Sequence, residues 1–318
     1  MSIVCSWIDF IDFVLNITKI VRIYQTRHTP RIKNKAYHIN TMSIKYITKA
    51  NKELFVPIIR ELSDQTSKKF DHNSKTYEEL NDWKDHELLD AVANRYSNSN
   101  RATTYITKDE LVNLMDWKLN IGTFRPSLPK LIRSNDEEQV EDATKVGFKI
   151  LLDYFNSLPT DFWSIATDEE LDKYKKVIRQ AMKELCKLKG VGPATSSLIM
   201  TCLYNIQPKY TPPFFSDESF MYYVLDPTKP GQKIKYSVKE YVEELLLVYF
   251  KLLKSDPEVT FVELERGGWT IKYFSLYHDD KLIDIKSPYT NDEEWETFKV
   301  DVEVDSLEPP KKKRKKST

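Results

Sequence analysis

The sequence predicts an all-α protein, and two observations support that fold class. At four places a Ser or Thr is followed three residues later by Glu and then by an apolar run with helical spacing, which is the pattern of a capping box at a helix start. Glycine is scarce, with 7 residues in 318, whereas the turns of all-β folds use it often. A hydrophobic fraction of 41% and an aromatic fraction of 12% are typical of a folded domain.

The predicted helices follow one another along most of the chain. The capping boxes place four helix starts at Thr107, Thr167, Ser237 and Thr260. Apolar spacing carries these helices to Leu119, Cys186, Leu253 and Phe274. Weaker helical patterns cover residues 52–64, 77–96, 127–133, 136–155, 193–206 and 217–225. Alternating residues at 281–285 and 298–304 predict two short strands that pair as a hairpin.

The two ends of the chain differ from its helical body, residues 42–290. The first residues are apolar, but Asp9 and Asp12 interrupt them, which argues against a membrane span and a secretory signal. Because Met42-Ser43-Ile44 repeats the first three residues, we expect 1–41 to be a dispensable extension, with a transit peptide as the alternative. Residues 291–318, acidic and then basic, are expected to form a disordered tail.

The body is slightly acidic, which argues against non-specific DNA binding over a large part of its surface but allows a local basic face. The three cysteines, Cys5, Cys186 and Cys202, are scattered and lack metal-ligand spacing. The simplest interpretation is that the protein resides in a reducing compartment. No set of four cysteines is available for an iron–sulfur cluster, and the five histidines are dispersed. The sequence therefore predicts no metal site.

A tight bend between two helical patterns is the most informative local feature. Gly190 and Gly192 flank Val191, and a second apolar run begins at once. Glycines permit a bend too tight for a side chain, and the first amides of the following helix have no partner within that helix. Such amides suit a phosphate. The alternative is an ordinary helix end and turn between two packed helices.

The order of segments after this bend resembles the DNA glycosylase superfamily of the helix–hairpin–helix type. A helix, a proline-broken loop and then Asp217 at the start of another helix follow the bend. The resemblance implies a two-lobed helical fold with the hairpin element at 168–206 and an aspartate at the mouth of a base pocket. Residues 110–135 are also similar to an uncharacterised, largely fungal group of proteins. By position, the residues expected to hold DNA phosphates are Lys189, Gly190, Val191, Gly192, Ala194 and Thr195.

The chemistry of base excision explains why such residues are needed. A base must leave the duplex stack, and breaking its glycosidic bond builds positive charge on the sugar, which a carboxylate can stabilise. The resemblance gives this role to Asp217, with Glu218 as the weaker candidate; the alternative is an acid that merely suits a helix start. Aromatic rings stack on an extruded base, although such rings more often belong to the core. The candidates for this pocket are Phe214, Phe215, Tyr222, Tyr223 and Trp163.

Three departures from the family qualify these expectations. Lys189 replaces a proline, Pro193 removes one amide, and the loop before Asp217 is longer. Because Ala194 stands where bifunctional members have a Schiff-base lysine, the resemblance implies a monofunctional enzyme that uses water. We expect no cofactor, since the cysteine count leaves no ligands for an iron–sulfur cluster, and a monovalent cation at the hairpin stays open.

The basic run at the end of the chain indicates a nuclear protein. It consists of Lys311, Lys312, Lys313, Arg314, Lys315 and Lys316. An import receptor would read such a run, and DNA is a second possible partner. The sequence thus predicts a nuclear DNA-binding protein in a repair context, with base excision as its activity. A non-catalytic chromatin scaffold or adaptor with the same fold is the alternative.

Overall fold

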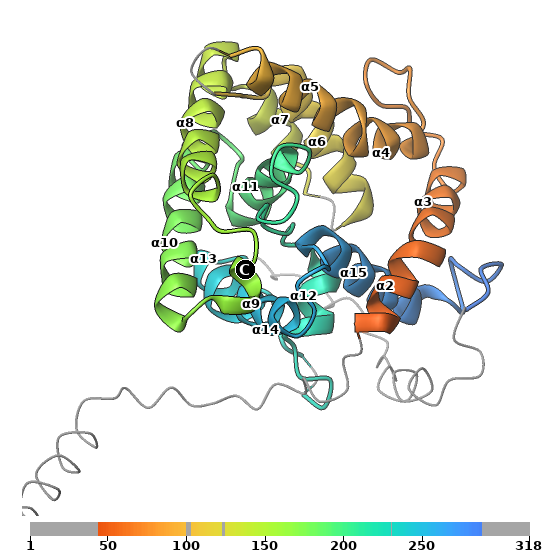
Figure 1. Ribbon diagram of the computed structural model, residues 1–318. Coiled ribbons are helices and arrows are strands. Elements are labelled where there is room, and N and C mark those ends of the chain that lie inside the picture. Colours follow the sequence, from red (N-terminus) through yellow and green to blue (C-terminus); the bar gives the residue numbers. More distant parts are fainter. Residues whose placement is uncertain (1–43, 100–102, 123–124, 230, 288–318) are drawn as a thin grey trace, which may run out of the picture. The chain divides into compact units, whose positions relative to one another are not determined.

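The computed structural model describes residues 44–99, 103–122, 125–229 and 231–287, and this part of the chain is helical, with no β-strand (Figure 1). The all-α prediction is therefore confirmed. The helices are α2 (Ile44–Glu53), α3 (Phe55–Asp64), α4 (Tyr77–Asp85), α5 (Glu87–Ser97), α6 (Lys108–Ile121), α7 (Leu128–Arg133), α8 (Glu137–Phe155), α9 (Phe162–Ile165), α10 (Asp168–Leu185), α11 (Pro193–Met200), α12 (Asp217–Tyr223), α13 (Val238–Glu240), α14 (Leu246–Ser255) and α15 (Phe261–Tyr277). A short 3₁₀ turn, η2 (Thr201–Leu203), follows α11, and a π turn, η3 (Tyr241–Leu245), precedes α14.

All four predicted capping boxes form. At the start of α6, the Thr107 side chain accepts the Glu110 N–H at 3.3 Å, and the Glu110 carboxylate accepts the Thr107 N–H at 2.7 Å. The same reciprocal pair occurs at the starts of α10, α13 and α15. Each pair satisfies two backbone donors that a helix start would otherwise leave without partners. The four strongest helix starts could therefore be predicted from the sequence.

Two of the weaker predictions need correction. The pattern over 77–96 is two helices, α4 and α5, separated at His86, whose φ and ψ of −126° and −71° are not helical. Apolar residues keep their spacing across this break, so the pattern hides it. The predicted strand at 281–285 is wrong, because residues 281–284 form a turn and residue 285 is irregular. Its predicted partner at 298–304, like the segments 1–41 and 291–318, lies outside the described residues.

The long helix α15 packs against α2, the first helix of the described chain, and against α12 (Figure 1). Two adjacent glycines allow this close packing. A side-chain carbon at Gly267 would lie 2.2 Å from the carbonyl oxygen of Ile47, and one at Gly268 would lie 2.3 Å from the ring of Tyr223. These contacts leave no space for any larger residue. The amino-terminal helix thus joins the carboxyl-terminal helices through a glycine pair.

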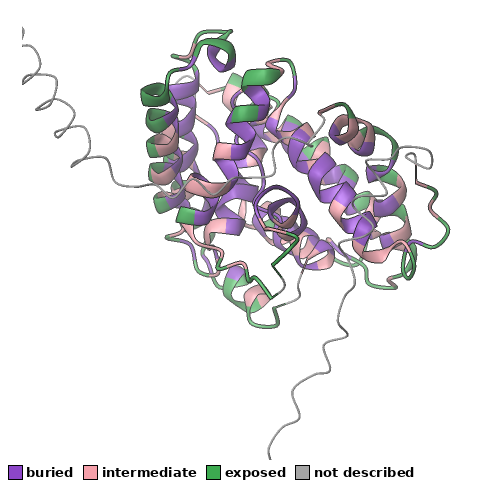
Figure 2. Cartoon of the chain, turned by 90° about the horizontal axis from the view of Figure 1, so that it is seen from below, coloured by how far each residue is buried: buried purple, intermediate pink, exposed green. Residues whose placement is uncertain are grey.

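The middle of the chain, α4 to α11, forms a second set of packed helices, in which α8 and α10 lie side by side (Figure 1). The helices carry buried residues on their inner faces and exposed residues outside (Figure 2). Aromatic rings fill the space near α9, where Trp163 lies 5.4 Å from Tyr174 and 5.8 Å from Phe250 between ring centroids. Burying several large aromatic side chains contributes strongly to the stability of such a core.

Candidate functional site

The predicted bend joins α10 to α11 and has the conformation that glycine permits. Gly190 has a φ of +80°, whereas Gly192 is extended and caps the start of α11. The bend packs against α7, because a side-chain carbon at Gly190 would lie 3.1 Å from Cβ of Leu131 and 3.3 Å from the Ile132 side chain. Gly190 is therefore required both by its backbone angles and by its neighbours.

One buried side chain holds the bend in place. The Asn135 Oδ1 accepts the Lys189 N–H at 2.8 Å, and its Nδ2 donates to the Lys189 carbonyl at 3.0 Å. The same Nδ2 donates to the carbonyl of Ile132 at 2.9 Å, at the end of α7. Asn135 is 1% exposed. This clamp is a part of the site that the sequence analysis missed, because a single Asn after a short helix has no distinctive pattern.

The predicted phosphate contacts divide into exposed and buried groups. The Lys189 side chain is exposed, and Gly190 and Gly192 are half-buried. The side chains of Val191, Ala194 and Thr195 are buried, so these residues can offer only backbone groups to a ligand. A side-chain carbon at Gly192 would have no atom within 4 Å. The open side of the bend therefore lies at Gly192.

Exposed cations stand beside the bend. Lys130 and Arg133 are exposed in the last turn of α7, and Lys189 reaches back so that its Nζ donates to the Ser134 carbonyl at 3.2 Å. The Arg133 side chain also pairs with Asp116 at 3.3 Å. We call Lys130, Arg133 and Lys189 the α7 patch. Three cations next to a bend that presents free helix-start amides make a local surface suited to anions.

Asp217, the predicted catalytic acid, opens α12 and lies among polar groups from three segments. Its Oδ2 accepts the hydroxyl hydrogen of Tyr236 at 2.8 Å, and the guanidinium of Arg125 lies 5.1 Å from the Tyr236 ring centroid. Burial lowers the pKa of Lys118; the charge of Asp217 opposes this change and that of Arg125 adds to it. We call Asp217, Tyr236, Lys118 and Arg125 the Asp217 cluster.

Burial and the charge of Asp217 raise the pKa of the Tyr236 phenol to about 12. Tyr236 has a positive φ of 54°, which is uncommon for a side chain of this size. Its hydroxyl therefore stays protonated at neutral pH and donates to the Asp217 carboxylate. The loop before Asp217 is fixed to α11, since the Phe215 N–H donates to the Ser197 Oγ at 2.8 Å.

Glu218, the weaker candidate, turns away from this cluster into the core. It is 7% exposed, and burial, followed by the charge of Asp217, raises its pKa to about 8. The indole N–H of Trp269 on α15 opposes that rise without reaching good hydrogen-bond geometry. Glu218 is therefore a protonated core residue at neutral pH, not a solvent-facing acid.

The aromatic residues predicted to hold a base are mostly part of the core. Trp163 and Phe215 are completely buried, and the Trp163 N–H donates to the Lys209 carbonyl at 2.9 Å. Tyr222 and Tyr223 are buried too, and the Tyr223 hydroxyl donates to the Leu264 carbonyl at 2.6 Å. Only Phe214 lies against a cavity. Sequence spacing cannot separate rings that pack a core from rings that line a pocket.

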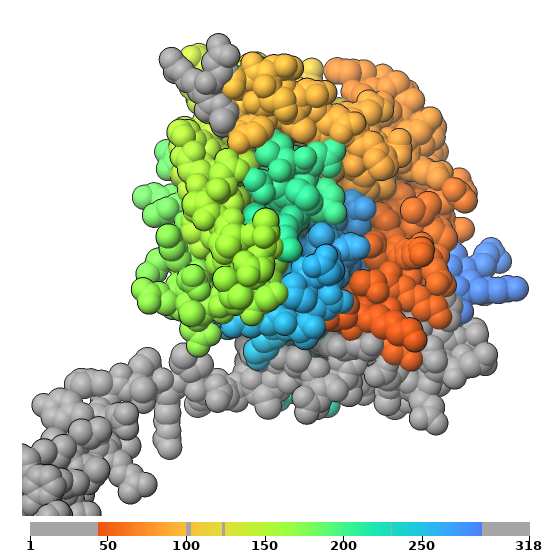
Figure 3. All heavy atoms as spheres, viewed as in Figure 1, coloured from red at the N-terminus to blue at the C-terminus, as the bar shows by residue number. Residues whose placement is uncertain are grey.

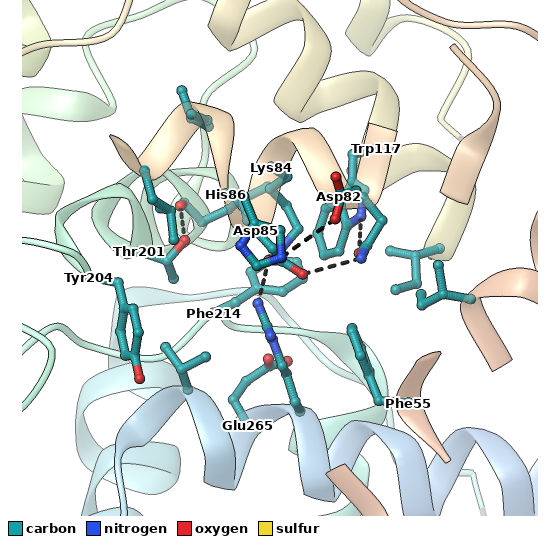
Figure 4. A pocket seen from close by; sticks show the side chains of 18 of the residues that line it. Phe55, Asp82, Lys84, Asp85, His86, Trp117, Thr201, Tyr204, Phe214 and Glu265 are labelled. Atoms are coloured by element: carbon teal, nitrogen blue, oxygen red, sulfur yellow. Dashed lines mark hydrogen bonds and ion pairs between the residues drawn. The ribbon is translucent and has the colours of Figure 1, made fainter. Parts of the chain in front are cut away.

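That cavity, of about 440 Å³, lies beside Thr201 at the carboxyl-terminal end of α11 (Figure 4). The bend lies at the other end of this helix. Segments around residues 55, 200 and 263 meet on the face of the molecule shown in Figure 3. The lining of the cavity includes the rings of Phe55, Trp117 and Phe214. Asp217 does not line it, so the cavity and the Asp217 cluster are separate features.

No family model, curated protein or solved structure matches this chain. Within the described residues, no helix is long and apolar enough to cross a membrane. The same part of the chain contains no group of three or more His, Cys, Asp or Glu residues placed to hold a metal ion. The functional argument therefore rests on the geometry of the bend, the α7 patch and the Asp217 cluster.

Proposed function

We propose that this protein binds DNA through the bend and the α7 patch and excises a base with the Asp217 carboxylate, in a fold of the DNA glycosylase type. One observation carries the proposal. The segment from α6 to α7 contributes Lys118 and Arg125 to the Asp217 cluster and also packs against Gly190 in the bend. A backbone-binding element and an acid among cations thus share one structural support.

In the two-lobed fold expected from the resemblance, the lobes would correspond to two sets of helices that pack into one compact unit. One set, α2 with α12 and α15, joins the two ends of the described chain, while α4 to α11 forms the other. The bend lies at the end of the second set, and Asp217 opens the first helix that returns to the other set. In the family that the chain resembles, phosphate contacts and the acid are divided between the lobes in this way.

The Asp217 cluster has groups suited to hydrolysis of a glycosidic bond. A carboxylate stabilises positive charge on the sugar or activates water, and the Tyr236 hydroxyl orients it. Arg125, which is exposed, can contact a phosphate, and Lys118 adds a second cation nearby. Because Ala194 supplies no amine, we assign water as the nucleophile and a monofunctional reaction.

The placement of the aromatic rings favours a second candidate, a non-catalytic scaffold that retains DNA binding. Four of the five predicted pocket rings lie in the core or away from the cavity. An extruded base would then lack the stacking partners that base-excising enzymes use. In both cases the basic run 311–316, which lies outside the described residues, would bring the protein to the nucleus through an import receptor.

Base release from lesion-bearing duplexes separates the two candidates. We expect the full chain to release a base from at least one member of a panel of deaminated, oxidised and alkylated duplexes. Asp217→Asn should lower that rate by about 10²–10⁴, the usual contribution of a positioned acid or base. Asp172→Asn, at an exposed acid paired with Lys175, is the matched control and should retain the rate. DNA binding without base release from any duplex would support the scaffold.

A further inference from the structure

The cavity at the carboxyl-terminal end of α11 is lined by both aromatic rings and charged side chains. The rings of Trp117 and Phe214 lie 5.9 Å apart between centroids on one side, and Phe55 contributes a ring from α3 (Figure 4). Tyr204 lines another part of it. A volume of about 440 Å³ is in the range of small-molecule sites. The walls therefore suit a planar ring system.

Two cations lie among these rings. The Lys84 ammonium lies 4.4 Å from the Trp117 ring centroid, and the Arg266 guanidinium lies 5.1 Å from the Phe55 ring centroid. Both cations pair with one carboxylate, that of Asp85, whose side chain is 10% exposed. Asp85 joins α4 to α15 across the cavity through this pair with Arg266.

The oxygens of Asp85 and Asn81 already accept hydrogen bonds, whereas Lys84 and Arg266 have N–H groups that donate to no acceptor in the described part of the chain. Oδ1 of Asp85 accepts from both Lys84 and Arg266, and Oδ2 accepts from the Asn81 amide at 3.2 Å. The Asn81 carbonyl oxygen accepts the Trp117 N–H at 3.0 Å. A guanidinium has five N–H groups and an ammonium three. One N–H from each cation donates to Asp85, and among the described residues neither cation makes a second hydrogen bond.

The nearest additional acid does not use up these donors. Glu265 lines the cavity and is 8% exposed, and its Oε1 accepts the hydroxyl hydrogen of Ser216 at 2.5 Å. The other acids in the lining have partners elsewhere: Glu78 pairs with Arg60, Asp82 with His86, and Glu263 with the start of α15. Among the ion pairs of Lys84 and Arg266, Asp85 is therefore the shared carboxylate. The nitrogens of Lys84 and Arg266 are not among the fully buried atoms that lack a hydrogen-bond partner, and the Arg266 side chain is 25% exposed. Their remaining donors can therefore be reached by a ligand that brings acceptors.

We propose that this cavity binds a small planar aromatic carboxylate, with its ring between Phe55 and Trp117 and its carboxylate on Arg266 and Lys84. The guanidinium fork matches a carboxylate in two parallel hydrogen bonds, and its position over Phe55 fixes its orientation. This site is independent of DNA binding and of Asp217, which does not line the cavity. Binding of such a ligand can therefore be tested independently of base excision.

Calorimetric titration of the full chain with 2-naphthoate and with its uncharged analogue 2-naphthamide tests the proposal. We expect saturable binding of the carboxylate and affinity for the amide weaker by about tenfold or more, because a charge-assisted bidentate pair is lost. Arg266→Gln should weaken 2-naphthoate binding by a similar factor of about ten. It leaves Asp85 paired with Lys84, so the cluster keeps a balanced pair.

Two further variants keep the result interpretable. Val56→Trp changes a residue that lines the cavity and is 51% exposed, so it should block entry without disturbing the core. Arg179→Gln, at an arginine that pairs with Glu243 outside the cavity, should bind like the wild type. The proposal is overturned if the wild type shows no saturable binding or does not distinguish carboxylate from amide. Binding that both Val56→Trp and Arg266→Gln leave unchanged would overturn it too.

Discussion

The two ends of α11 show two different ways of building a binding surface. At its amino-terminal end, a glycine bend held by Asn135 offers backbone groups beside the α7 patch. At its carboxyl-terminal end, Thr201 and Cys202 face a cavity lined by aromatic rings and buried ion pairs. The first end is formed by backbone conformation, and the second by side chains from distant helices.

This difference determines how substitutions act. At the bend, a change alters the backbone path or the hydrogen bonds that fix it, so its cost appears as lost stability. At the cavity, a change alters the balance of buried charges, so its cost depends on pH and on ligand. The predictions below use this contrast, beginning with the largest expected effect on stability.

The largest effect is expected for Asn135→Ala, because it removes four hydrogen bonds and leaves the Lys189 amide and carbonyl without their partner. We expect the free energy of unfolding to fall by about 3 kcal/mol, the sum of lost hydrogen bonds and buried polar groups left unsatisfied. Chemical denaturation measures it. Asn98→Ala, at an exposed helix end, is the control. A loss as small as that of the control would mean that the bend does not depend on this clamp.

A smaller effect separates the two glycines of the bend. Gly190→Ala places a side chain at a φ of +80° and against Leu131, so we expect a loss of about 2 kcal/mol. Gly192→Ala has an extended backbone and open space around the new carbon, so its loss should stay below about 1 kcal/mol, the cost of a poorer helix cap. Thermal or denaturant unfolding of both variants compares them. Equal losses would contradict the conformation of the bend.

At the cavity end, Glu265 should make stability depend on pH. Burial is the main cause that raises the pKa of this group from 4.5 to about 7. Between these two values the unfolded chain ionises while the folded protein stays protonated, so stability falls as pH rises through this window. Glu265→Gln removes that fall, which we put at about 1–2 kcal/mol after allowance for partial solvation. Denaturation at pH 4.5 and pH 7.5 measures it.

The control for this prediction is Glu258→Gln, at an exposed carboxyl outside the cavity. It should leave the pH dependence of the wild type unchanged. Parallel pH profiles of Glu265→Gln and the wild type would show that Glu265 is already ionised in the folded protein near pH 6.

The sequence allowed the helical class, the helix starts and the bend to be predicted, because capping boxes and paired glycines act through neighbouring residues. It did not allow the placement of the aromatic rings to be predicted. Trp163 and Phe214 look alike as sequence features, yet one fills the core and the other lines the cavity. Asn135 and the Asp85–Arg266 pair were missed because their partners lie 54 and 181 residues away along the chain.

Binding of duplex DNA by the full chain, with the six basic residues of 311–316 replaced by Gln, tests the central claim that the bend holds a DNA backbone. The account predicts binding that weakens steeply with salt, as expected when several phosphates are contacted. Gly192→Ala in the same background should weaken binding by about three- to tenfold, because its new carbon occupies the space of a phosphate that the amides hold. The claim is contradicted if the chain without its basic run does not bind DNA, or if Gly192→Ala binds DNA as well as its parent.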